Sequence, residues 1–148
     1  MINPIRTLST IEYFPDGRPW QETLLARPDC DAVETAIRRM DNHWYPIVVL
    51  SKLDVDAATE DENGFHIIGG NGRYALFEHM GGWQYANPTG SEADAELWSS
   101  DQGYFCQEKN IADLALTLRL ARIFFETGSY EALDQFLNHF FSSPGESP

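Results

Sequence analysis

The run "GGNG" at residues 69–72 stands directly before Arg73 and has the composition of a loop that could bind phosphate. Glycine-rich loops bind phosphate where they follow a strand and open a helix, with a lysine or a dinucleotide spacing of glycines. Here the following residues, "RYALFEHM", contain no lysine and continue into a second apolar stretch. Asn71 and Gly72 form the pair that favours positive φ at both corners of a two-residue hairpin. We therefore expect a β-turn rather than a phosphate site.

Histidine and cysteine side chains could bind a metal ion or supply a nucleophile. No two histidines have the spacing of zinc ligands. Cys106 could be combined with His79 and Glu108 in a nucleophilic triple, but no local sequence signature supports one. We predict no catalytic residue, no metal ion and no cofactor. In a reducing compartment, Cys30 and Cys106 are expected to be free thiols.

Net charge is the most distinctive property of this chain. Its 148 residues include 10 Lys and Arg against 23 Asp and Glu, a net charge of -13. Such a charge repels nucleic acid and anionic membranes and accelerates encounter with a cationic surface. Between Lys52 and Lys109 the only basic residue is Arg73, so the middle of the chain is strongly acidic. Acidic loops can simply keep a protein dissolved, and the alternative is that they bind a basic partner.

The apolar pattern predicts one α+β domain over residues 1–141 and a loose tail over 142–148. We expect an antiparallel sheet of about five to six strands packed with two to three helices. Strands are expected at 2–11 and 43–53, in a three-stranded meander over 65–87, and once or twice within 97–107. Pro46 places the second of these at a sheet edge or near a strand beginning.

Three helices are predicted from apolar residues at intervals of three and four. The first lies between Pro28 and Asp41, with Asp29 or Asp31 as its N-cap. The second begins at Asn110 and ends at Gly128, and Ser129 caps a third. The start "MINPIRTLST" has no basic leader and no apolar run approaches a membrane span, so we expect a cytoplasmic protein.

Three stretches of the second half resemble the Imm1-type immunity proteins of bacterial polymorphic toxin systems. They are "IIGGNGRYALFEHMGGWQY", the strand region around Trp98 to Phe105, and "ALTLRLARIFFETGSYEALD", where an aromatic pair is followed by Thr-Gly. The resemblance covers about residues 65–134. It implies a small cytoplasmic α+β domain that binds and blocks a cognate toxin and has no catalytic residues of its own.

The resemblance and the charge together suggest a site. Toxins that act on nucleic acids have basic grooves, which an acidic protein can occupy. We expect the loops 54–62 and 92–101 to supply carboxylates, and nearby aromatic residues to supply apolar anchorage. Large aromatic side chains are more often in the core, and only an exposed one would serve. The candidate toxin-binding residues are Asp54, Asp56, Glu60, Asp61, Glu62, Trp83, Tyr85, Glu92, Asp94, Glu96, Trp98 and Asp101.

Two other functions stay open at this stage. The first is a small enzyme or ligand-binding domain with an anion site near Arg73, whose isolation among acidic residues favours a role in binding. That arginine could equally pair with a carboxylate inside the protein. The second is an adaptor or chaperone for a secreted effector, which would also suit an acidic composition.

Overall fold

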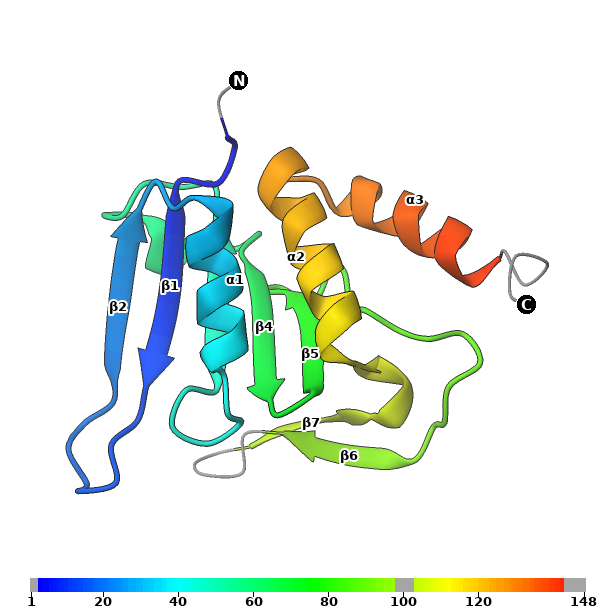
Figure 1. The fold of residues 1–148 in the computed structure, drawn as a ribbon, viewed down its shortest axis with the longest axis horizontal. Helices are drawn as coiled ribbons and strands as arrows, with labels where there is room; N and C mark the ends of the chain where they lie inside the picture. Colours follow the sequence, from blue (N-terminus) through cyan, green and yellow to red (C-terminus); the bar gives the residue numbers. More distant parts are fainter. Residues whose placement is uncertain (1–2, 98–102, 143–148) are drawn as a thin grey trace.

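The computed structural model describes residues 3–97 and 103–142 and confirms the predicted α+β fold class (Figure 1). A six-stranded antiparallel sheet has the order β2-β1-β3-β4-β5-β8, and β6 and β7 form a separate hairpin. The strands are β1 (Thr7–Glu12), β2 (Gln21–Ala26), β3 (Ile47–Ser51), β4 (Phe65–Gly70), β5 (Arg73–Glu78), β6 (Asp94–Leu97), β7 (Tyr104–Gln107) and β8 (Ile111–Ala112). The helices are α1 (Cys30–Arg39), α2 (Leu114–Thr127) and α3 (Tyr130–Phe141), with short 3-10 turns η1 (Ala58–Glu60) and η2 (Glu108–Asn110).

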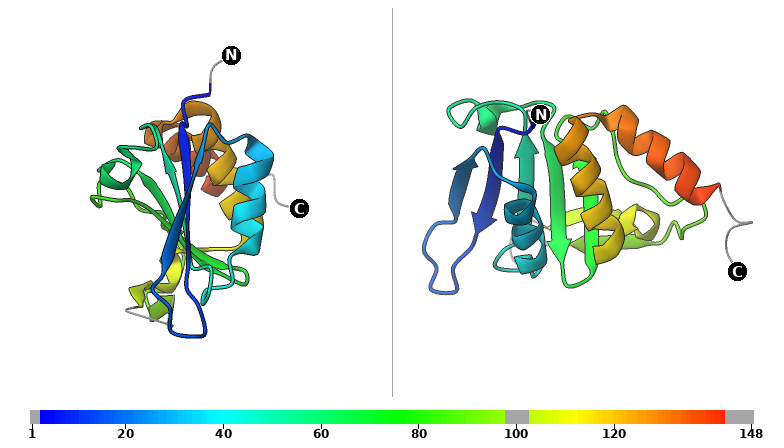
Figure 2. Two further views of the ribbon diagram at one scale, coloured as in Figure 1. Left: turned by 90° about the vertical axis from the view of Figure 1, so that its left-hand side faces the viewer. Right: turned by 45° about the horizontal axis from the view of Figure 1, so that its top comes forward.

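The three helices lie on one side of the sheet and bury its apolar face (Figure 2). Successive strand residues point to opposite faces, so alternate positions of β1, β3, β4 and β5 meet the helices. Phe65 of β4, for example, stacks on Phe124 of α2 with ring centroids 4.8 Å apart. This core also contains Leu8, Val33, Ile37, Val48, Leu50, Ile67, Tyr74, Leu76, Leu120, Leu133 and Leu137.

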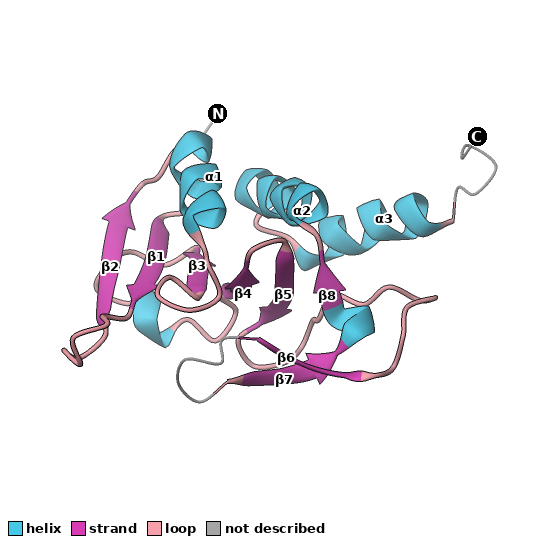
Figure 3. Cartoon of the chain, turned by 60° about the horizontal axis from the view of Figure 1, so that its bottom comes forward, coloured by secondary structure: helices cyan, strands magenta, loops and turns pink. Residues whose placement is uncertain are grey.

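The β6–β7 hairpin packs against the opposite side of the sheet, which we call the helix-free side (Figure 3). Leu97 of β6 is buried against Ile47, Ile68 and Ala75. The ring of Tyr104 stacks on that of Phe77 of β5, with centroids 4.9 Å apart and planes 3° from parallel. Apolar contacts therefore hold the hairpin to the sheet. They also determine which face of the hairpin points outward.

The glycine run forms the predicted hairpin turn between β4 and β5. Gly70 pairs with Arg73, and the two corner residues Asn71 and Gly72 have φ of 55° and 87°. Gly70 itself has φ of 145° and is bridged to Asp41, where a Cβ atom would collide with the main chain of residues 40–42. The glycines thus serve a tight turn and a close approach of two backbones.

Helix caps agree with the sequence except at one position. Asp29 caps α1 by accepting from the Ala32 N–H at 2.8 Å, and Ser129 caps α3 in the same way from Ala132 at 3.1 Å. Gly128 ends α2 in the left-handed conformation. The predicted start of α2 at Asn110 is wrong, because the cap is Asp113, which accepts from Leu116 N–H at 2.8 Å.

Asn110 instead joins two segments in the interior. It is buried, donates from its side-chain amide to the carbonyl of Tyr85 at 3.0 Å, and accepts from the backbone N–H of Gln107 at 3.1 Å. The side chain of a good N-cap residue can form hydrogen bonds with any nearby backbone group. That of Asn110 bonds to backbone groups outside the helix instead of to the first N–H groups of α2.

The strand predictions need three corrections. β3 lies in the middle of the sheet between β1 and β4, and Pro46 directly precedes it, so the sheet-edge alternative is wrong. Edge strand β2 was not predicted. Gly81 and Gly82 do form a turn, but the third strand of the meander is reduced to the single bridge between Phe77 and Gln84. Of the predicted tail, residues 143–148 lie outside the described part of the chain.

Candidate functional site

Two acidic segments lie on the helix-free side of the sheet (Figures 2 and 3). The first, residues 54–62, connects β3 to β4, and the second, residues 91–97, leads into and forms β6. Neither segment contains a lysine or arginine. Their carboxylates are Asp54, Asp56, Glu60, Asp61 and Glu62 in the first and Glu92, Asp94 and Glu96 in the second.

Within the first segment, three carboxylates are fully available to a partner. Asp56, Glu60 and Glu62 are exposed and form no ion pair with any basic residue of the described chain. Asp54 pairs with Arg6 at 3.1 Å, and both side chains are exposed, so solvent screens the pair.

Asp61 does not fit its predicted contact role. Its side chain is buried, with Oδ2 accepting from the Ser51 hydroxyl at 2.6 Å and Oδ1 from the Asn63 N–H at 2.9 Å. A buried carboxylate needs such donors. The residue therefore fastens the acidic segment to the end of β3.

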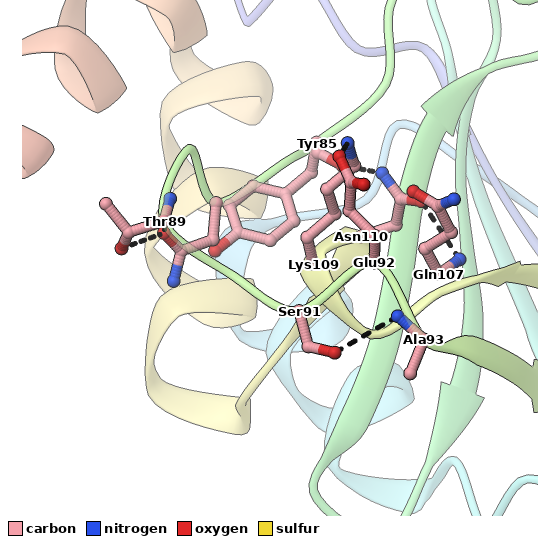
Figure 4. A network of polar contacts seen from close by, with 9 residues as sticks. Tyr85, Thr89, Ser91, Glu92, Ala93, Gln107, Lys109 and Asn110 are labelled. Carbon is pink, nitrogen blue, oxygen red and sulfur yellow. Dashed lines mark hydrogen bonds and ion pairs between the residues drawn. The ribbon is translucent and has the colours of Figure 1, made fainter.

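The second segment is held by backbone contacts to η2, and within it the Ser91 hydroxyl accepts from the Ala93 N–H at 3.0 Å (Figure 4). Lys109 donates its N–H to the Ser91 carbonyl at 2.8 Å, and Glu108 donates to the Ala93 carbonyl at 2.9 Å. Lys109 Nζ also pairs with Glu92 at 3.3 Å, which partly neutralises that carboxylate. Farther along β6, Asp94 and Glu96 are exposed, with no ion pair to a described basic residue.

The predicted aromatic anchors that the structure describes lie in the core. Trp83 is buried, and its Nε1–H donates to Asp134 of α3 at 2.7 Å. Tyr85 is buried near Phe141, with ring centroids 6.4 Å apart. Neither side chain has the exposure that an interface anchor requires. Trp98 and Asp101 lie outside the described residues.

Sequence reasoning missed Phe105, an exposed aromatic residue on this side of the molecule. Phe105 of β7 is 72% exposed and pairs across the hairpin with Glu96. Strand alternation is the signal that could have found it. Because Tyr104 points inward to Phe77, the next residue must point outward.

A groove of about 260 Å³ lies between the first acidic segment and the open part of the sheet. Its walls include Trp20, which is 54% exposed, Val49 of β3 and Glu22 of β2. Glu22 Oε2 accepts from the Ser9 hydroxyl at 2.6 Å, and the rings of His66 and His79 stack with centroids 4.9 Å apart. The groove combines apolar walls with groups that can accept hydrogen bonds.

His66 is held in its neutral form inside this groove. Burial and, to a lesser extent, the neighbouring His79 lower the pKa of its imidazole to about 4, while Asp61 opposes the shift. An imidazole with this pKa is uncharged at neutral pH.

This depressed pKa makes the stability of the fold depend on pH. Between pH 6.5 and 4 the unfolded state binds a proton at His66 that the folded state excludes, so stability falls as the pH is lowered through that window. We expect His66 to contribute a loss of about 3 kcal/mol there, from a shift of roughly 2.5 units at 1.36 kcal/mol each.

Urea unfolding of the wild type and of His66→Gln across this window measures the effect. For each protein the free energy of unfolding is plotted against pH. The difference between the two slopes gives the contribution of His66, because the other titrating groups are common to both proteins. His79→Gln, at an exposed position, is the control and should retain most of the pH dependence. Identical pH profiles for His66→Gln and the wild type would contradict the assignment.

Arg73, the candidate for an anion site, is paired within the protein. Its guanidinium forms two hydrogen bonds to Glu108, at 3.1 and 2.8 Å. The bond to Arg73 holds the pKa of the Glu108 carboxyl below its usual range. This bidentate pair sets a carboxylate against the guanidinium charge, which weakens its attraction for an anion.

The cysteines lack the setting of activated nucleophiles. Cys30 and Cys106 are both free thiols, as predicted. Burial raises the pKa of the Cys106 thiol, and the adjacent Glu108 raises it further. Catalytic cysteines need the opposite shift, which stabilises the thiolate.

Metal binding, membrane insertion and similarity to known proteins give no further assignment. Within residues 3–97 and 103–142, no group of three or more His, Cys, Asp or Glu side chains could hold a metal ion. None of the described helices has both the length and the apolar character needed to cross a bilayer. No family model, curated protein or solved structure matches this chain.

Proposed function

We propose that this protein is an immunity protein that binds a cognate bacterial toxin and covers its active site. The toxin would be a basic protein that acts on nucleic acid, and the acidic helix-free side would occupy its phosphate-binding groove. In this role the protein acts in the cytoplasm, where the toxin meets its target, and it needs no catalytic residue or cofactor.

The segregation of charge between the two sides of the sheet carries this proposal. Five exposed carboxylates without an ion pair to a described basic residue lie in the two acidic segments: Asp56, Glu60, Glu62, Asp94 and Glu96. On the other side the charge is nearly balanced, because α1, α2 and α3 carry four arginines, at positions 38, 39, 119 and 122, against five carboxylates, at positions 31, 34, 126, 131 and 134. A side rich in carboxylates and poor in bases attracts a cationic protein and orients it during encounter.

Co-expression tests the proposal. The chain would be produced in cells together with the C-terminal domain of a secretion-associated protein encoded directly beside its gene. We expect cells that make the toxin domain alone to die and cells that make both proteins to grow, with the two proteins eluting as one complex. An adaptor for secretion would bind without protecting the cell. Death despite co-expression would refute the immunity function.

A further inference from the structure

We infer that the outer face of the β6–β7 hairpin is the docking surface for the basic partner, with Phe105 as its apolar anchor. The occupant is a protein surface on which lysines or arginines surround an apolar pocket. This inference rests on the proposed function and names the part of the acidic side that makes the central contact.

The two faces of the hairpin differ sharply in burial. Inward residues pack on the sheet, as shown by Leu97, which is 1% exposed, and by Tyr104 stacked on Phe77. Alternation then sends Phe105 and its cross-strand partner Glu96 outward. At 72%, the ring of Phe105 is the most exposed of the large apolar side chains in the described chain.

The ring of Phe105 contributes little to packing on the sheet, because most of its surface is exposed. Phe77 and Tyr104 already cover each other, and Leu97 fills the space above Ile68 and Ala75. An aromatic ring left in water gains about 25 cal/mol for each Å² of apolar surface that a partner covers. Its burial in a partner's pocket would therefore supply lasting contact, which lowers the dissociation rate.

Charge around the ring selects the partner. Glu96 lies directly across from Phe105, Asp94 lies two residues farther along the same face, and neither β6 nor β7 contains a lysine or arginine. Nucleic acid and anionic lipid are repelled by this face. A second copy of this chain is disfavoured too, because a two-fold contact would bring the same carboxylates together.

The docking face is held in place before any partner arrives. Apolar contacts fix the inner face of the hairpin, and the hydrogen bonds from η2 to residues 91 and 93 fix the approach to β6. Preorganisation reduces the conformational entropy lost on binding, so a small anchor can contribute strongly.

Variant binding tests this surface. The dissociation constant of the purified chain for the toxin domain encoded beside its gene would be measured by calorimetry for wild type, Phe105→Ala, Phe105→Leu and the pair Asp94→Asn, Glu96→Gln. We expect Phe105→Ala to weaken binding about a hundredfold, as an interface hot spot does. Phe105→Leu should recover part of that loss. The carboxylate pair should slow association at least fivefold at low salt, as measured by stopped-flow mixing.

A matched control tests whether the loss of affinity is specific to Phe105 or follows from removing any exposed phenylalanine. Phe140 of α3 is 51% exposed and lies on the helix side, so Phe140→Ala should bind within threefold of the wild type. Thermal unfolding of each variant confirms that it is folded. Wild-type binding together with near-normal binding of Phe105→Ala would overturn the docking surface alone. A wild type that neither binds nor protects cells would overturn the proposed function and this inference with it.

Discussion

Reversal of Asp56, Glu60 and Glu62 to lysine is expected to slow association with the toxin about a hundredfold at low salt. These three carboxylates are exposed and have no ion pair with a described basic residue, so their field reaches an approaching partner. Each reversal changes the charge of the first acidic segment by two. Stopped-flow mixing at low and high salt measures the rate, and the difference from wild type should shrink as salt screens the charges.

A second triple variant, Asp31→Lys, Glu126→Lys and Glu131→Lys, controls for net charge. It changes the total charge by the same amount but lies on helices α1, α2 and α3. We expect this variant to associate much faster than the first. Equal slowing in the two triple variants would mean that the total charge of the protein governs association and that the position of the first acidic segment does not matter.

Gly70→Ala is expected to destabilise the fold by about 4 kcal/mol, by combining a strained φ with a backbone collision. Gly70 has φ of 145°, and an added Cβ atom would meet the main-chain nitrogens of Asp41 and Asn42. Backbone atoms cannot rotate away as a side chain can, so either the β4–β5 hairpin or the end of α1 must shift. Urea denaturation measures the loss.

Gly72→Ala provides the comparison within the same turn. Gly72 also has a positive φ, at 87°, but a Cβ atom there would meet no atom within 4 Å. Only the backbone strain applies, and we expect a loss of about 1 kcal/mol. Similar losses for the two variants would show that the close approach at Gly70 contributes little.

Features set by neighbouring residues could be predicted from the sequence. The Asn71-Gly72 turn, the Asp29 and Ser129 caps and the Gly128 helix end each depend on the chemistry of a few adjacent residues. The start of α2 could not be predicted in this way, because Asn110 and Asp113 are both good caps three residues apart. The carbonyl of Tyr85, distant in sequence, decides between them.

The burial or exposure of individual site residues could not be predicted from the sequence, because it depends on tertiary contacts. The acidic character of residues 54–62 is visible directly, but the burial of Asp61 follows from its contact with Ser51. Likewise, Trp83 and Phe105 are both aromatic residues close to acidic ones. Packing against α3 buries the first, and the outward register of β7 exposes the second.

The same limit applies to edge strand β2. Its sequence, "QETLLA", mixes polar and apolar residues without the strong alternation of a half-buried strand, and all six of its residues are exposed or partly exposed. Pairing with β1 over six residue pairs creates it. Its presence extends the sheet and brings Glu22 into the groove on the helix-free side.

Mapping of the bound surface by nuclear magnetic resonance tests the central claim most directly. The isotope-labelled chain would be titrated with the unlabelled toxin domain, and backbone amide shifts recorded for each residue. We predict the largest changes in the acidic segments 54–62 and 91–97 and around Phe105, with the outer surfaces of α1, α2 and α3 little changed. Shifts confined to those helices, with both acidic segments unaffected in a fully bound sample, would contradict the account.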